Sequence, residues 1–313
     1  PMALGVAGGL FGSAALAWLA PGTPGLWTQI MAGLMTGLCV FVIAALAVEL
    51  QEEVQKRRRE DETVWQTTWQ HLQRTRRRYG GYLVHVGVVF VFLGFAGYGF
   101  RLERSVALAK GEWTALGNYV VQFKDLKAWR DNQKKMFEGF LRVHKKQTLA
   151  QDTVSTQWST VEPLAHTQIR LARDPSQSIP RLQLALRTKD RTTLHPLPTL
   201  LSVQGKLLSV SMPSTTQASS YQVLRPGAFV TQMVPARHKH HKHREPTTEV
   251  ALKTRLFDDI YAILVTWEAL PGKPLLAHFK FYLNPLIFWI WFGGLIMLCG
   301  AIITLLPTRK KGA

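Results

Sequence analysis

Apolar residues are concentrated in four long runs instead of being spread evenly along the chain. The runs cover residues 2–20, 27–48, 82–100 and 285–306, and a turn rich in Pro and Gly at 21–25 separates the first two. Each run is close to the ~20 residues that an α-helix needs to cross a hydrocarbon core of ~30 Å. Lipid offers no hydrogen-bond partners to a non-helical backbone, so each run is predicted to be a transmembrane helix.

The distribution of Lys and Arg predicts how these helices are oriented. The connecting segment 50–81 and the tail 307–313 are rich in basic residues, whereas the short turn 21–26 contains none. The positive-inside rule therefore places the basic segments in the cytoplasm and the long segment 101–284 outside it. All four helices then agree with one topology, in which both ends of the chain are inside.

The basic segment 50–81 has a pattern of its own. Trp65, Trp69 and Leu72 recur at helical spacing among basic residues. This favours an interfacial helix, with its Trp face in the headgroup layer and its charges toward anionic membrane lipid. A helix packed on another protein and a solvated charged loop are the alternatives.

The long outer segment 101–284 is predicted to be rich in β-structure. Short runs that alternate or are dense in β-formers, separated by turn residues, occur at 118–123, 181–187, 206–210, 260–267 and 277–282. Such spacing is typical of a sandwich or a partly open barrel. Residues 130–180 are polar and weakly periodic, so they are predicted to form a loop-rich insertion. The fold class is therefore membrane α-helical, with about four transmembrane helices and a β-rich extracytoplasmic domain.

Composition limits the chemistry. The chain has 38 Lys and Arg against 20 Asp and Glu, a formal charge of +18. This excess fits a membrane surface or an acidic partner, and no nucleic-acid recognition module accompanies it, so we expect no nucleic-acid partner. Cys39 and Cys299 lie inside apolar runs without CxxC spacing, which favours two buried thiols over a disulfide framework or a zinc site.

The usual enzyme motifs are missing from the sequence. It contains no phosphate-binding loop, nucleophile elbow, zincin motif or dinucleotide fingerprint. Any catalysis would therefore depend on a cofactor that the protein positions. The chain opens with Pro1 and has no basic region before its first apolar run. We expect this start to be internal to a longer protein and not a signal peptide.

His85 is the most informative single residue. It lies inside the third apolar run, close to its basic end. An ionisable side chain in a membrane helix faces the bundle interior and usually has a function. A neutral imidazole is a common axial ligand of haem iron. A structural hydrogen bond across helices, or a proton relay, would explain the same residue.

Residues around His85 fit either reading. Gly81 and Gly87 have no side chain, so a neighbouring helix or a flat macrocycle can approach closely. Arg76, Arg77 and Arg78 lie just outside the apolar run and can pair with carboxylates such as haem propionates. If His85 has a structural role without haem, these arginines only set the orientation of the helix in the membrane.

A second group of histidines lies in the outer segment. Four imidazoles that can chelate a transition metal occur close together, at His238, His240, His241 and His243. Lys and Arg are interleaved with them, which opposes a divalent ion. A solvated basic loop that docks acidic partners or headgroups is the alternative. His278, in the last predicted strand before the final helix, is a weaker ligand candidate.

Several segments resemble the CcmF-type cytochrome c haem lyases. The segment Arg76–Val88 is similar to the sequence around one of that family's two membrane histidines. Further similar segments are Lys110–Glu112, Tyr221–Pro226, Thr248–Ala251, Asp259–Ala262 and Asn284–Gly294. With gaps, the resemblance runs from about residue 27 to 307 and corresponds to the C-terminal half of the family.

The resemblance implies a concrete function. Members of this family are multi-pass proteins of the bacterial inner membrane with a large periplasmic domain. They receive haem from a chaperone of the CcmE type and attach it to the CxxCH motif of apocytochrome c, which a CcmH-type thiol chaperone presents. They also hold a permanent haem b between two membrane histidines, and His85 stands at one of those positions.

The sequence also departs from the family. The Trp-rich haem-binding segment, the two outer histidines that flank it and the other membrane histidine are missing. All belong to the family's N-terminal half, so the chain is expected to be a fragment or a separately encoded subunit and to be inactive alone. A non-catalytic scaffold that docks assembly partners is the alternative function. The run His238–His243 is not a feature of the family.

Overall fold

The chain folds into two compact units, which are described separately. The first comprises residues 1–103, 253–260 and 282–313, and the second comprises residues 104–252 and 261–281. The computed structural model describes residues 7, 10, 14, 25–57, 76–132, 134–154, 157–162, 164, 166–173, 182–188, 191–196, 199–204, 206–210, 220–240, 245–269, 271 and 274–305.

Three long apolar helices dominate the first unit. They are α2 (Leu26–Arg57), α4 (Arg76–Tyr98) and α5 (Ile287–Leu305), and each is long and apolar enough to cross a membrane. They confirm helices at three of the four predicted runs. Most of the run 2–20, and the interfacial helix predicted around Trp65, fall outside the described residues. Both α2 and α4 continue beyond their apolar runs into the basic segment 50–81, because Gln, Glu, Lys and Arg are good helix formers.

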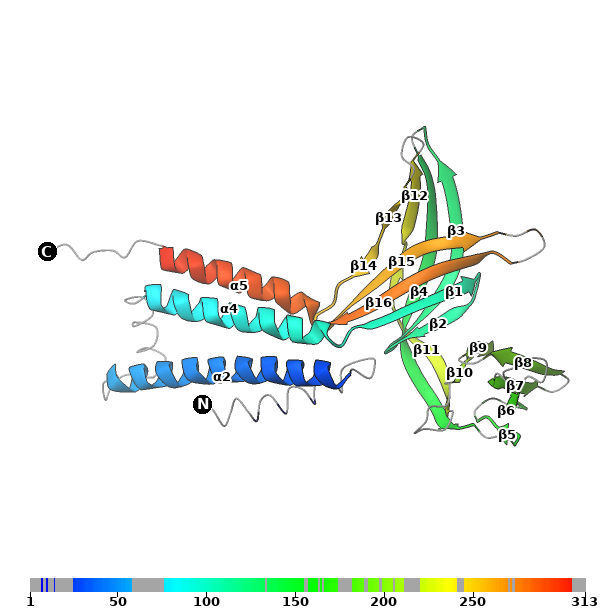
Figure 1. Ribbon diagram of the computed structural model, residues 1–313, viewed down its shortest axis with the longest axis horizontal. Helices are drawn as coiled ribbons and strands as arrows, with labels where there is room; N and C mark the ends of the chain where they lie inside the picture. Colours follow the sequence, from blue (N-terminus) through cyan, green and yellow to red (C-terminus); the bar gives the residue numbers. More distant parts are fainter. Residues whose placement is uncertain are drawn as a thin grey trace. The chain divides into compact units, whose positions relative to one another are not determined.

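Helices α4 and α5 lie side by side and touch through glycines (Figure 1). A Cβ added to Gly87 would lie 2.7 Å from the carbonyl oxygen of Gly293, and one on Gly300 would lie 2.7 Å from that of Gly80. Gly94 lies on the same side of α4, two turns beyond Gly87, and packs on Ile290. Small residues at this spacing let two membrane helices bring their backbones together.

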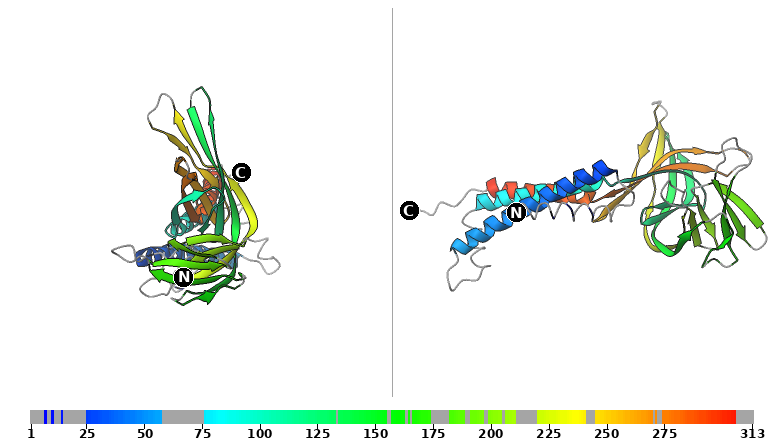
Figure 2. Two further views of the ribbon diagram at one scale, coloured as in Figure 1. Left: turned by 90° about the vertical axis from the view of Figure 1, so that its right-hand side faces the viewer. Right: turned by 60° about the horizontal axis from the view of Figure 1, so that its bottom comes forward.

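Helix α2 packs on the opposite side of α4 and crosses it at an angle (Figure 2). Ala32 and Ala96 belong to one buried cluster at one end of the contact. Near its middle, the Cys39 thiol lies 3.6 Å from the carbonyl oxygen of Val89. Both cysteines are free, as predicted, but only Cys39 is buried. The expectation of a buried Cys299 is wrong for the chain alone, because this residue lies on a face of α5 that α4 does not cover.

The β-structure forms three sheets, which confirms the β-rich prediction. The first has the order β1 (Leu102–Ala109), β16 (Leu276–Pro285), β15 (Asp258–Glu268), β14 (Ala251–Lys253). The second has the order β13 (Thr247–Glu249), β12 (Ala236–His240), β4 (Lys134–Thr153), β11 (Ser220–Met233), β10 (Lys206–Val210), β9 (Thr199–Val203), with β3 (Tyr119–Arg130) also on β4 and β2 (Trp113–Leu116) on β3. The third has the order β5 (Ser159–Thr160), β6 (Gln168–Arg173), β7 (Leu182–Thr188), β8 (Arg191–Pro196).

One part of the core of the second unit lies between the first two sheets, and another lies between the third sheet and strands β9–β11. Phe123 of β3 contacts Phe279 of β16, with ring centroids 5.1 Å apart, and both side chains are fully buried. Gly139 of β4 leaves room for the same ring, because a Cβ there would lie 2.8 Å from it. The outward positions of the strands carry polar side chains, as expected when one face of each sheet is solvated.

The prediction of a loop-rich insertion at 130–180 is wrong. This region contains β4, which pairs with β3 on one side and with β11 on the other, and also β5 and β6. Its sequence looks irregular because only the middle of β4 buries apolar residues, Leu141 and Val143, while its two ends are polar, with Lys134 and Lys135 at the start and Asp152 and Thr153 at the end. Backbone pairing on both sides, and not apolar alternation, holds this strand in place.

Candidate functional site

His85 lies on α4 with one ring nitrogen fixed by the helix backbone. Its Nδ1 is 2.8 Å from the carbonyl oxygen of Gly81, one turn earlier. A carbonyl oxygen can only accept a hydrogen bond, so Nδ1 carries the proton and Nε2 keeps its lone pair. The side chain is exposed in the chain alone. The structure therefore presents an imidazole in the tautomer that binds a metal through Nε2.

The face of α4 that carries His85 is open. Residues 81, 85, 88 and 92 share this face by helical spacing. Apart from the neighbouring backbone of α4 itself, no heavy atom of the described structure lies within 4 Å of a Cβ added to Gly81, and Phe92 is 40% exposed. There is room here for a further helix or a planar group.

Gly87 points to the other side of α4. A Cβ at this position would meet Met297 and the backbone of Gly293, both on α5. Of the two uses predicted for this glycine, the close approach of a helix is the one that its surroundings fit. Because Gly87 packs against α5, the side of α4 that carries His85 faces away from α5.

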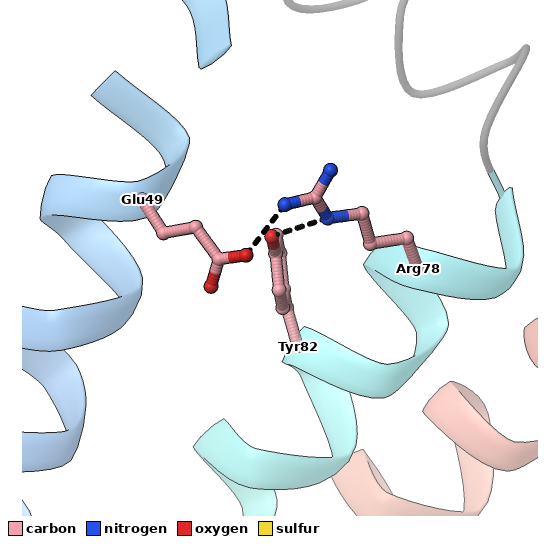
Figure 3. A network of polar contacts seen from close by, with 3 residues as sticks. All are labelled: Glu49, Arg78 and Tyr82. Atoms are coloured by element: carbon pink, nitrogen blue, oxygen red, sulfur yellow. Dashed lines mark hydrogen bonds and ion pairs between the residues drawn. The ribbon is translucent and has the colours of Figure 1, made fainter. Parts of the chain in front are cut away.

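The three predicted arginines occupy the first turn of α4, and all are exposed. Arg78 forms an ion pair with Glu49 of α2 at 2.5 Å and donates a hydrogen bond of 2.7 Å to Tyr82 (Figure 3). Arg78 and His85 are seven residues apart, so they lie on one side of α4 and about 10 Å apart along its axis. The basic residues thus stand two turns from the imidazole.

An apolar groove lies between α2 and α4 at the other end of these helices. Its volume is about 510 Å³, and it is lined by Trp27, Thr28, Met31, Ala32, Met35, Phe95, Ala96 and Gly99. Phe95 is ten residues beyond His85, about 15 Å along the helix. The groove is therefore separate from the open imidazole nitrogen.

The outer histidines that were predicted as metal ligands are partly described. The rings of His238 and His240 lie on β12 with centroids 6.4 Å apart, while His241 and His243 fall outside the described residues. His238 is buried, with Nδ1 3.3 Å from the Lys134 ammonium and Nε2 3.5 Å from a Glu249 oxygen. Among the described residues, no group of three His, Cys, Asp or Glu is placed to hold a metal ion.

Both nitrogens of His238 have partners. A charged ammonium only donates, so Nδ1 accepts from Lys134 and the Nε2 proton points to Glu249. The ring therefore links three strands and has no lone pair left for a metal in this arrangement. His278 of β16 has one contact of this kind, since its Nε2 lies 3.1 Å from a Glu268 oxygen.

Sequence reasoning missed one outer histidine, His144 of β4. Its ring lies between Trp113 and Phe229, with centroids 5.8 Å and 5.6 Å away. Its Nδ1 is 3.2 Å from the carbonyl oxygen of Gly227. These residues come from three strands that are far apart in the sequence, so only the strand register brings them together.

Comparisons with known proteins find one similar sequence and one similar solved structure. Over 97 residues the chain is 28% identical to the cytochrome c-type biogenesis protein NrfE of Haemophilus influenzae, a stretch that is 31% of this chain and 15% of that protein. The solved structure of the cytochrome c haem lyase CcmF matches 98% of this chain, with a TM-score of 0.50 and 16% sequence identity. No family model matches the chain.

These matches confirm the resemblance to CcmF-type proteins that the sequence predicts. At this level of identity the solved structure shows a shared fold, which includes the apolar helices and the β-rich domain. The chain spans about a third of that structure, since it covers 34% of it. It is thus similar to one part of a longer protein.

Proposed function

We propose that this chain, which resembles CcmF-type proteins, acts in cytochrome c maturation as the C-terminal part of a membrane haem lyase. In this proposal His85 supplies one axial ligand to a haem b inside the membrane. The observation that carries the proposal is the Nδ1 contact of His85 with the Gly81 carbonyl, which leaves Nε2 open on an otherwise apolar helix. Haem iron, when bound there, would supply one-electron redox chemistry.

The surroundings of His85 fit a planar, acidic group. The open position over Gly81 gives a flat macrocycle access to the helix backbone. Arg76 and Arg77 are exposed at the basic end of α4, and neither has a carboxylate partner among the described residues. In this proposal they pair with the propionates, whereas Arg78 is already shared with Glu49.

The chain's own residues would fix the imidazole before any haem arrives. The Gly81 carbonyl selects the tautomer of His85, as backbone carbonyls do for many metal-ligating histidines. The glycine contact with α5 holds the rotation of α4, so that Nε2 points away from α5. These contacts orient the ligand and lower the entropy lost when it binds iron.

Completion of the site requires a companion. We infer that the second axial histidine comes from the N-terminal half of the lyase, packed against the open face of α4. The complex would lie in the bacterial inner membrane, with the β-rich domain in the periplasm. There it would work with a CcmE-type haem chaperone, apocytochrome c and its CcmH-type thiol chaperone.

A non-catalytic scaffold is the second candidate function. Large apolar side chains stand exposed on the β-rich domain, among them Trp129 at 55% and Phe229 at 59%. Exposed aromatic residues of this size are enriched at protein interfaces. A scaffold would dock assembly partners through them without needing the imidazole of His85.

Absorption spectroscopy separates the two functions. The full chain is co-expressed with the N-terminal half, and the purified complex is examined under reducing conditions. We expect a spectrum of haem with two histidine ligands, and its loss in His85→Ala at unchanged protein yield. His278→Ala is the matched control and should keep the spectrum. A colourless wild-type complex would rule the haem site out, as would a haem spectrum that is unchanged in the His85→Ala complex.

A further inference from the structure

The surroundings of His144 repeat the arrangement at His85 in a different unit of the molecule. Nδ1 lies 3.2 Å from the Gly227 carbonyl oxygen, which can only accept, so the proton is on Nδ1. Nε2 therefore keeps its lone pair and has no hydrogen-bond partner among the described residues. A backbone carbonyl that holds Nδ1–H is a common arrangement behind a metal-binding Nε2.

Two irregularities in β11 create this arrangement. The pairing of β11 with β4 shifts between Pro226 and Phe229 and again between Phe229 and Thr231, on either side of the Phe229–His144 pair. A β-bulge re-aims side chains and backbone groups and is frequent next to functional sites. Gly227 lies within the first irregularity, where a Cβ would come within 3.1 Å of the Lys145 carbonyl oxygen.

Aromatic rings frame the imidazole on two sides. The Phe229 ring meets it edge to face at 70°, and Trp113 lies tilted at 55° on the other side. Phe229 is 59% exposed. A large apolar side chain left in solvent, beside an imidazole whose Nε2 has no hydrogen-bond partner among the described residues, offers contact area to a planar apolar ligand.

Cations flank the imidazole along the same strand. Arg142 and Lys146 lie two residues before and after His144 on β4, whose pairing with β3 is regular from Arg142 to Lys145. The alternation of side chains along the strand therefore puts the three on one face. Each cation is about 7 Å along the strand from His144. Neither has a carboxylate partner among the described residues.

We propose that His144 is an axial ligand for the iron of a haem bound on this face of β4. Trp113 and Phe229 contact the macrocycle, and Arg142 and Lys146 pair with its carboxylates. The inference rests on the proposed function for the identity of the ligand. It adds a second haem contact, on the β-rich domain, where haem would pass on its way to apocytochrome c.

A free metal ion fits this site less well than haem. A structural or catalytic zinc needs three or four protein ligands, and among the described residues no group of three His, Cys, Asp or Glu is placed to supply them. Haem iron brings four nitrogen ligands of its own and needs one imidazole from the protein. Two nearby cations also repel a divalent ion and attract an anionic porphyrin.

Hemin titration of the full chain tests the proposal. All variants carry His85→Ala, so that binding in the membrane unit does not contribute, and Soret absorbance reports binding. We expect an imidazole-ligated spectrum, and His144→Ala should weaken binding by on the order of tenfold or more. Phe229→Ala, at an exposed position that tolerates truncation, should weaken binding several-fold, as should the double variant Arg142→Gln/Lys146→Gln.

Two further ligands and one control sharpen the result. Iron-free protoporphyrin should bind much more weakly than hemin, Zn²⁺ alone should not displace hemin, and His278→Ala should bind hemin as its parent does. Unchanged affinity and spectrum in His144→Ala would overturn the proposal, as would equal binding of iron-free porphyrin or competition by Zn²⁺. The haem b test uses a different sample, the complex with the N-terminal half and an intact His85. A failure of the His85 proposal in that test can therefore be told apart from a failure of the His144 proposal in the hemin titration.

Discussion

Two imidazoles, His85 and His144, make the same kind of local contact. In each, a backbone carbonyl takes the Nδ1 proton, one within a helix and one across a bulged strand pair. His238 and His278 differ because carboxylates contact their Nε2 atoms. At the residue scale, the histidines therefore differ in whether Nε2 has a hydrogen-bond partner. The number and spacing of histidines in the sequence do not reveal this difference.

Asp259 permits a test of buried charge at the same scale. Its side chain is only 2% exposed and accepts a hydrogen bond of 3.1 Å from the Arg255 amide. Burial raises its pKa above the ordinary 3.8, the amide hydrogen bond opposes this, and Asp258 adds to it. As pH rises past 3.8 the unfolded chain ionises first, so the folded state loses stability until its own, higher pKa is passed.

Replacement of this carboxyl by an amide should remove that loss. We expect Asp259→Asn to unfold at a higher temperature than the parent, by a margin that grows as pH rises above 3.8 and then levels off. The amide carbonyl still accepts from Arg255, so the hydrogen bond is retained. Thermal unfolding in detergent across pH 4–8 measures the margin. A margin that shrinks with rising pH would contradict the assignment.

At the scale of elements, the contact between α4 and α5 depends on what glycine lacks. Gly80 and Gly87 on α4 face Gly300 and Gly293 on α5, at a spacing of two helical turns. Lipid gives no hydrophobic drive for helix association, so close backbone packing has to supply it. The same contact fixes the rotation of α4 and with it the direction of His85.

A single methyl group should disturb this contact. Gly293→Ala would place a Cβ 2.6 Å from the Gly87 carbonyl oxygen, so the helices must separate. We expect a loss of about 1–3 kcal/mol, the usual range for overpacking. Gly294→Ala, one residue later, meets nothing within 4 Å and should be neutral. Denaturant or thermal unfolding of both variants measures the difference. Equal stability would mean that the glycines do not hold the helices together.

At the scale of the whole molecule, the sequence predicts those parts of the structure that have a periodic or compositional signal. Three apolar runs became helices, because hydropathy and length are read directly from the chain. Strand β4 was missed because its polar ends hide a pairing that both neighbouring strands enforce. The His144 site was missed because it depends on strand register and on irregularities in β11. Neither of these can be predicted from a local sequence pattern.

The predicted membrane orientation follows from charge, and it can be tested with single cysteines. The native thiols, Cys39 and Cys299, are first replaced by Ser. Gln51 and Lys239 are exposed and belong to the first and second units, respectively. If the positive-inside rule holds, a membrane-impermeant maleimide should label Lys239→Cys in intact spheroplasts. Gln51→Cys should react only after the membrane is permeabilised. Labelling in the reverse order would place the β-rich domain in the cytoplasm, where apocytochrome c does not receive haem in the proposed scheme, and the proposed function would then fail with it.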